Sequence, residues 1–89
     1  MNEVVKKAYE KNKGECEWNC GYLPDVEVGE NVEINDIWDG NGENPTETGC
    51  DSVSYKVTDS DWINYCFEVV EKKERELDTI VKITAIEML

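Results

Sequence analysis

The side chains that could do chemistry in this chain are mainly oxygen and sulfur ligands, and the densest group of oxygens is the polar loop at residues 39–49. From Asp39 to Glu43 the loop carries side-chain oxygens at alternate positions, as an EF-hand calcium loop does at its start. The pattern then fails, because Asn44 stands at the sixth position, which requires Gly, and Cys50 at the twelfth, which requires Glu. We therefore expect an acidic turn and no metal site.

The four cysteines, Cys16, Cys20, Cys50 and Cys66, could in principle ligate zinc or form two disulfides. Their spacing is that of neither a zinc site nor a known disulfide framework, and Cys66 falls within a predicted strand. Without a secretory signal at the start of the chain, reduced thiols are the default. We expect small buried or free thiols and no cofactor, while bridged and metal-bound states remain open alternatives.

Catalytic side chains have little support in this sequence. There is no histidine, which excludes Ser-His and Cys-His nucleophile pairs and imidazole metal ligands. Asp59 and Asp61 could be imagined as an acid and base pair, but on a turn both would be solvated, and nothing would separate their pKa values. We therefore predict no catalytic residues and no enzyme activity.

The distribution of charge is the most informative feature of the sequence. The formal net charge is −12, and residues 14–67 alone hold thirteen acidic residues against the single base Lys56. Self-repulsion of this size opposes folding, so the charge serves either solubility or a positively charged partner. It also disfavours direct binding to a phosphate backbone. The start of the chain, residues 1–13, is net positive, with four lysines against two glutamates.

A predicted partner-binding face follows from these acids and one tryptophan. Trp38 stands at the mouth of the polar loop among carboxylates, which is the composition of a binding hot spot rimmed by charge and, equally, of a buried corner. Trp62, in contrast, is expected in the core. The predicted face consists of Glu30, Glu33, Asp36, Trp38, Asp39, Glu43, Glu47, Asp51, Asp59 and Asp61.

A chain of 89 residues predicts a single domain spanning 1–89, with a small core. The run from Trp62 to Val70 is the densest in aromatic and β-branched residues, and we predict that it forms the central strand. On a strand, Ile63, Tyr65, Phe67 and Val69 share one apolar face. A helix over 62–76 is the open alternative, because apolar residues also recur there at helical spacing.

The remaining elements are arranged around that strand. Residues 1–14 predict a short amphipathic helix that docks through Val5 and Tyr9, and residues 26–89 predict an antiparallel sheet. Its strands are expected at 26–38, interrupted by a turn at 29–31, at 52–58, at 62–70 and at 79–89. The 52–58 and 62–70 strands should form a hairpin, and 71–78 a charged connection. The expected class is α+β, with a strongly curved sheet of about four strands resembling an SH3-like or OB-like, partly open barrel.

Two function classes are compatible with these features. The first is a small acidic interaction module that occupies the basic groove of a nucleic-acid-binding protein by reproducing the charge of a phosphate backbone. In size, acidity and lack of catalytic residues, the chain is similar to small inhibitors encoded by phages and mobile elements, such as anti-CRISPR proteins and uracil-DNA glycosylase inhibitors. That similarity is one of general character, without a shared motif, and it assigns no role to any residue.

The second class is a non-catalytic accessory small-barrel module that docks on another subunit through apolar surface, with its charge serving solubility. A metal-binding module is a more distant alternative. No run approaches the roughly 18 apolar residues of a membrane span, so we expect a soluble, cytoplasmic protein with no membrane partner.

Overall fold

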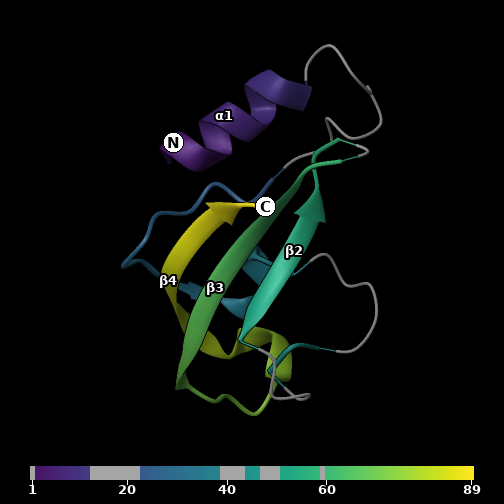
Figure 1. The fold of residues 1–89 in the computed structure, drawn as a ribbon. Coiled ribbons are helices and arrows are strands. Elements are labelled where there is room, and N and C mark those ends of the chain that lie inside the picture. The colour runs from purple at the N-terminus through teal and green to yellow at the C-terminus, as the bar shows by residue number, and fades with distance from the viewer. Residues whose placement is uncertain (1, 13–22, 39–43, 47–50, 59) are drawn as a thin grey trace.

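The computed structural model describes residues 2–12, 23–38, 44–46, 51–58 and 60–89, and its central feature is a four-stranded antiparallel sheet (Figure 1). Within these residues the two edge strands do not pair with each other, so the sheet is open and is not closed into a barrel. The predicted α+β class, a short helix on an antiparallel sheet, is confirmed. The strands lie in the order β1 (Asn31–Glu33), β4 (Ile80–Met88), β3 (Trp62–Glu71) and β2 (Ser52–Lys56).

β3 is the central strand that the sequence predicts, and the alternative of a helix over 62–76 is wrong. Ile63, Tyr65 and Phe67 are buried on one face of the strand, as the alternation requires. Val69 continues that face but is 42% exposed. Trp62 is also 44% exposed, so the prediction that it lies in the core is wrong. The reason is its position at the start of the strand, on the face opposite to Ile63.

The connections on either side of β3 also match the prediction. β2 and β3 pair as an antiparallel hairpin, with Val53 opposite Tyr65. β4 pairs with β3 on one side and with β1 on the other, which ties the end of the chain into the sheet. The charged connection at 71–78 contains one short 3-10 turn, η3 (Glu76–Asp78).

The N-terminal helix α1 (Glu3–Asn12) crosses one end of the sheet, and η3 lies at the opposite end (Figure 1). Asn2 caps α1, since its side-chain oxygen accepts a hydrogen bond of 2.8 Å from the Val4 N–H. Val5 and Ala8 are fully buried beside β4, and Tyr9 is half-buried. A helix this short is marginal alone, so its packing on the sheet stabilises it.

The segment at 26–38 differs most from its prediction. The expected long strand is reduced to β1 and is followed by a second 3-10 turn, η2 (Ile34–Asp36). A strand would place Ile34 and Ile37 on opposite faces, whereas residues three apart in a 3-10 turn lie on the same side. Both isoleucines are therefore fully buried. The turn before β1 is centred on Gly29, whose φ of 91° suits glycine.

The hydrophobic core lies between one face of the sheet and a layer formed by α1 and residues 23–38. η2 belongs to this layer and lies behind the sheet in the view of Figure 1. The core residues are Val5, Ala8, Leu23, Val26, Ile34, Ile37, Val57, Ile63, Tyr65, Phe67, Val81, Ile83 and Ile86.

Candidate functional site

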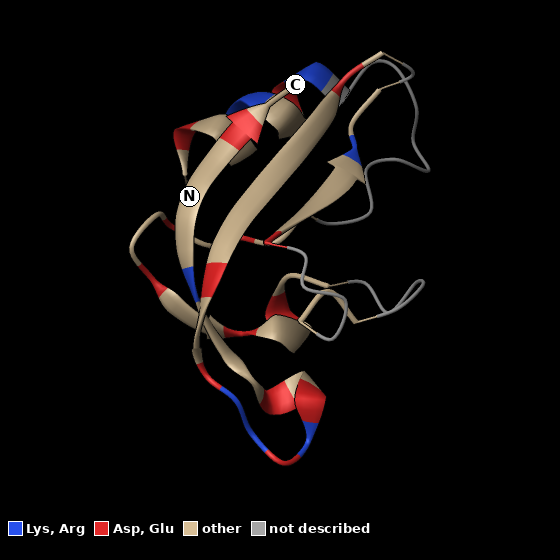
Figure 2. Cartoon of the chain, turned by 60° about the horizontal axis from the view of Figure 1, so that its bottom comes forward, with Lys and Arg blue, Asp and Glu red and all other residues tan. Residues whose placement is uncertain are grey.

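The segment at residues 23–38, called the acidic segment below, has the most one-sided charge in the described chain. It contains five acidic residues and no Lys or Arg. Figure 2 shows the contrast with α1 and the connection between β3 and β4, which carry basic residues as well as acidic ones. All five acidic side chains are exposed: Asp25, Glu27, Glu30, Glu33 and Asp36.

Two tyrosine hydroxyls fix the start of the acidic segment, which has little regular secondary structure of its own. The Tyr9 hydroxyl donates to the Leu23 carbonyl at 3.1 Å and accepts from the Leu23 N–H at 2.7 Å. The buried Tyr65 hydroxyl donates to the Pro24 carbonyl at 2.9 Å. Burial, more than its neighbouring groups, raises the pKa of Tyr65, so the hydroxyl keeps the proton that it donates. Asp25 follows directly and is therefore held in place.

A third tyrosine fixes the other end of the segment. The Tyr55 hydroxyl on β2 donates to the Ile37 carbonyl at 2.8 Å. Its ring also packs edge-on against that of Tyr65, with the ring centroids 5.8 Å apart. Asp36 precedes Ile37, so both ends of the acidic segment are attached to the sheet by side chains that the core holds rigid.

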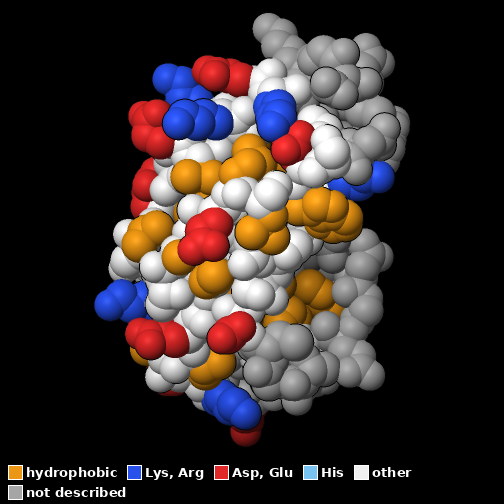
Figure 3. Space-filling view, viewed as in Figure 1, with side chains coloured by type: hydrophobic (Ala, Val, Ile, Leu, Met, Phe, Trp, Pro, Cys, Tyr) orange, Lys and Arg blue, Asp and Glu red, His pale blue; other side chains and the backbone are white. Residues whose placement is uncertain are grey.

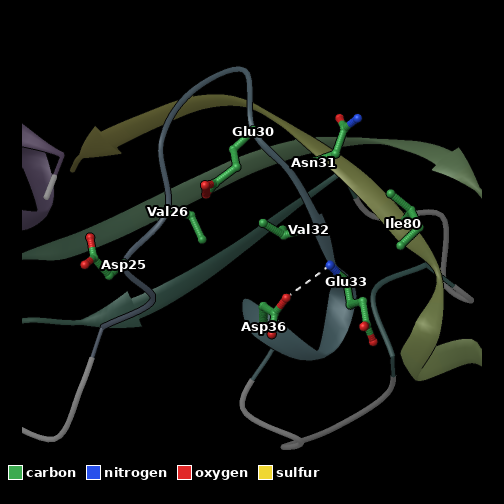
Figure 4. A pocket seen from close by; sticks show the side chains of 8 residues that line it. All are labelled: Asp25, Val26, Glu30, Asn31, Val32, Glu33, Asp36 and Ile80. Carbon is green, nitrogen blue, oxygen red and sulfur yellow. Dashed lines mark hydrogen bonds between the residues drawn. The ribbon is translucent and has the colours of Figure 1, made fainter.

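Between these attachments the segment surrounds an open depression with a volume of about 570 Å³. Figure 4 shows the carboxylates of Asp25, Glu30 and Asp36 around Val26 and Val32, which form its apolar floor. The carboxylate of Glu33 points away from this centre. The full lining is Asp25, Val26, Glu30, Asn31, Val32, Glu33, Asp36 and Ile80.

Backbone hydrogen bonds orient two of these carboxylates. Glu30 accepts from the Glu27 N–H at 3.3 Å, and Asp36 accepts from the Glu33 N–H at 3.2 Å. A carboxylate has about four acceptor sites, so each keeps capacity for an external donor. None of Asp25, Glu30, Glu33 and Asp36 forms an ion pair with a described Lys or Arg. The depression thus presents carboxylates whose chemistry suits a positively charged group.

Of the predicted face, the structure brings Glu30, Glu33 and Asp36 together and places other members elsewhere. Asp61 forms an ion pair of 2.8 Å with Lys11 on α1 and accepts from the Thr58 hydroxyl at 2.6 Å. These two contacts hold the pKa of Asp61 below its ordinary value. Asp61 therefore attaches α1 to the β2–β3 turn and does not belong to the depression.

Trp38 and Asp51 also lie apart from the depression. Trp38 is half-buried and packs against the core, as expected of a corner residue. Asp51 is exposed beside the opposite edge of the sheet, where its carbonyl accepts from the Phe67 N–H. The predicted members Asp39, Glu43, Glu47 and Asp59 lie outside the described residues.

The sequence-based face omitted Asp25, which lines the depression opposite Asp36. One feature of the sequence could have predicted the role of Asp25. No Lys or Arg occurs between residues 23 and 38, which marks this stretch as a single acidic segment. The predicted face begins at Glu30 and leaves out the two acids that precede the turn at 29–31. Glu27, the other omitted acid, bonds the Asn2 side chain at 3.3 Å.

The described residues include Asn44 of the candidate calcium loop and Cys66 of the four cysteines. The Asn44 side-chain oxygen accepts hydrogen bonds from the N–H and hydroxyl of Thr46, as expected of a polar turn. Cys66 is half-buried, and its burial, followed by the charges of Glu87 and Asp51, raises the pKa of the thiol. Across the residues that the structure describes, no three acidic or cysteine side chains are grouped to hold a metal ion. Cys16, Cys20 and Cys50 lie outside those residues.

In comparisons with known proteins, no family model, no curated protein and no solved structure matches this chain. None of the helices in the described ranges is long and apolar enough to cross a membrane.

Proposed function

We propose that this protein is a non-catalytic acidic module that occupies the basic nucleic-acid groove of a DNA- or RNA-handling protein. The observation that supports this proposal is the depression formed by Asp25, Glu30 and Asp36, whose carboxylates have no described basic partner. Grouping like charges costs stability, and this cost is offset when a cationic partner binds. The site is therefore better suited to recognition than to folding.

The chemistry of such a partner follows from the ligands that the depression offers. Duplex DNA presents about one negative charge per 1.7 Å of its axis, and proteins that bind it carry clustered Lys and Arg. A carboxylate accepts the two parallel N–H groups of a guanidinium as a phosphate does. The apolar floor, Val26 and Val32, adds contact for the stem of a long basic side chain.

A phage- or mobile-element-encoded inhibitor in the cytoplasm, similar in character to anti-CRISPR proteins and other DNA mimics, is the biological setting we favour. Such an inhibitor needs no catalytic group, because it acts by occupying the groove. Complementary charge accelerates its association with the target and makes the affinity depend on salt.

The direct test is a charge-neutral variant of the depression, D25N/E30Q/D36N. Its matched control is E74Q/E76Q/E87Q, which removes the same number of charges from exposed side chains that do not line the depression. Tagged proteins are used to capture partners from host lysate at about 50 mM and about 500 mM salt. Affinity for the captured protein is then measured by calorimetry.

We expect the wild-type chain to capture a basic, nucleic-acid-processing protein at the lower salt, with DNA or RNA displacing it. The depression variant should bind at least about 30-fold more weakly, the effect of losing roughly 2 kcal/mol of charge complementarity. The control should stay within about threefold of wild type. Equal weakening of both variants would show that net charge, and not this site, determines binding.

An accessory module that docks through apolar surface is the second candidate. The observation in its favour is the exposure of Trp62, at 44%, and Leu89, at 63%. A partner captured equally well at both salt concentrations would support it, since apolar contacts respond little to ionic strength.

A further inference from the structure

β1 is an edge strand, because the sheet formed by the described residues ends there. Its register with β4 shows which backbone groups face the open side. The Ile34 N–H donates to the Thr79 carbonyl at 2.9 Å, and the Glu30 carbonyl accepts from the Ile83 N–H at 2.9 Å. In an antiparallel pair such bonds recur at every second residue, so the even-numbered residues here face β4. Asn31 therefore directs its N–H and C=O to the open side.

The next outward-facing residue, Glu33, is less accessible to another chain. Its N–H donates to the Asp36 carboxylate at 3.2 Å, and the backbone then turns into η2. Pairing along this edge is therefore centred on Asn31, which offers one donor and one acceptor. A single residue of an antiparallel segment can bond both groups, as in the peptide recognition mode that adds a strand to a sheet edge.

The acidic depression lies along this open side of β1. Val32 contributes to its floor, and Asp25 and Val26 line it across from β1 (Figure 4). The side chains of Asn31 and Glu33 point away from the centre of the depression, whereas Val32 points toward it. This is the alternation expected of a strand. A chain that pairs with β1 therefore passes beside the depression.

The same alternation determines which side chains of such a segment reach the carboxylates. A residue paired with Asn31 has its side chain on the same face as the Asn31 side chain, away from the depression. Its two neighbours in sequence point to the Val32 face, where the carboxylates of Asp25, Glu30 and Asp36 lie. Two basic residues separated by one residue therefore both reach the depression, whereas two adjacent basic residues point to opposite faces.

Charge distinguishes the β1 edge from other surfaces of the sheet. β2, the edge strand on the other side, contains Lys56 and no acidic residue. On the face of the sheet seen in Figure 3, acidic and basic side chains are interspersed with hydrophobic ones. The β1 edge combines an open backbone with the carboxylates of the depression, so complementary charge directs a basic segment to this edge.

We propose that β1 binds an extended basic-x-basic segment, antiparallel to the strand, with residue x paired to Asn31 and both basic side chains in the depression. This inference rests on the proposed function, because the segment belongs to the basic protein that the depression recognises. It adds the conformation of that segment and the spacing of its basic residues. Acidic residues beside an exposed edge also oppose pairing with segments that lack positive charge.

The test uses three capped synthetic peptides and the isotope-labelled full chain. The probe is Thr-Arg-Thr-Arg-Thr. The first control, Thr-Thr-Arg-Arg-Thr, has the same composition and charge, but its arginines are adjacent. The second control is the probe with an N-methyl group on the central Thr, which removes the donor to the Asn31 carbonyl and keeps the charge. Affinities are measured by NMR titration at about 50 mM salt, with peptide up to about 5 mM because a short segment binds weakly.

We expect the probe to bind at least about fivefold more tightly than either control, as the loss of one hydrogen bond or one charge contact predicts. The probe should also shift the resonance of the Asn31 amide, which gains an acceptor. D25N/E30Q/D36N should weaken probe binding at least about tenfold, and E74Q/E76Q/E87Q should stay within about threefold of wild type. The peptide controls leave the protein unchanged, so a folding defect cannot explain their effect.

Equal affinity of the three peptides overturns the proposal, because the depression would then bind positive charge without pairing along β1. If D25N/E30Q/D36N still weakened binding in that case, the proposed function would stand without the strand geometry. A probe that does not bind at all overturns the proposal as well, whereas capture of a basic protein from lysate tests the proposed function separately.

Discussion

The acidic segment and the β2–β3–β4 sheet differ in the partners of their backbone N–H and C=O groups. In the sheet, neighbouring strands satisfy each other, and the pairing runs without a break from Ile63 opposite Met88 to Cys66 opposite Ala85. The acidic segment forms only three residues of strand, and bonds to side chains supplement its isolated backbone bonds, such as that from the Gly29 N–H to the Ile83 carbonyl. At both ends of the segment, tyrosine hydroxyls donate hydrogen bonds to its backbone carbonyls.

Under the proposed function, the sheet provides rigidity and the acidic segment provides the binding residues. The sheet supplies a core that fixes the tyrosines, and the tyrosines fix a segment whose own sequence is free to carry charge. Loops held on a rigid scaffold are where binding residues commonly lie. The carboxylates of the depression can thus be changed without removing any contact of the core.

The largest effect is expected from a substitution that destabilises the sheet itself, since the acidic segment depends on it. I63A truncates a fully buried side chain at the centre of the core and should lower the free energy of unfolding by about 2–5 kcal/mol. A small domain has only about 5–15 kcal/mol in total, so both regions should unfold together. Urea unfolding followed by circular dichroism measures the change. V70A, at a position that is 52% exposed, should stay within about 0.5 kcal/mol of wild type.

A smaller change should separate the two regions. Y65F removes the hydroxyl that binds the Pro24 carbonyl and leaves a buried acceptor without its donor, which costs about 1–3 kcal/mol. Hydrogen exchange should show faster exchange at residues 23–33 than in β3 and β4, and affinity for the basic partner should fall.

The comparison variant is Y55F, which removes the half-buried bond to Ile37 and should cost about 0.5–1.5 kcal/mol. Exchange that accelerates equally throughout the sheet in Y65F would contradict the view that Tyr65 attaches the segment.

The smallest expected effect concerns the ion pair that attaches α1. The pKa of Asp61 is lowered in the folded protein, so its stabilising contribution is present above the unfolded value of 3.8 and is lost as the pH falls through the folded pKa. D61N should therefore be slightly less stable than wild type at pH 7. The difference should shrink as the pH falls below about 3.8, and a difference that persists there would contradict this origin.

Much of the sheet could be predicted from the sequence, because its strands alternate. Ile63, Tyr65 and Phe67 are buried on one face as the period of two requires. Trp62 could not be placed, since its exposure depends on which face of the strand end is covered. The strand over 26–38 was over-extended because Ile34 and Asp36 fit the same alternation, while the short-range bond from the Glu33 N–H to Asp36 favours a turn.

The acidic site could be predicted only in part. Charge count pointed to its central residues, Glu30, Glu33 and Asp36. Long-range contacts decide that Asp25 lines the depression and that Asp61 does not. No local sequence pattern predicts the ion pair between Lys11 and Asp61 or the hydrogen bond from Tyr65 to Pro24.

The pairing of β1 with β4 has a consequence for the time at which the depression can form. Asn31 lies opposite Lys82, so the acidic segment depends on a strand that is distant from it in the sequence. Until β4 pairs with β1, the segment carries the acidic sequence without the full shape of the depression. Long-range closure of this kind is slow relative to hairpin formation. We therefore expect the depression to form late in folding, after the β2–β3 hairpin.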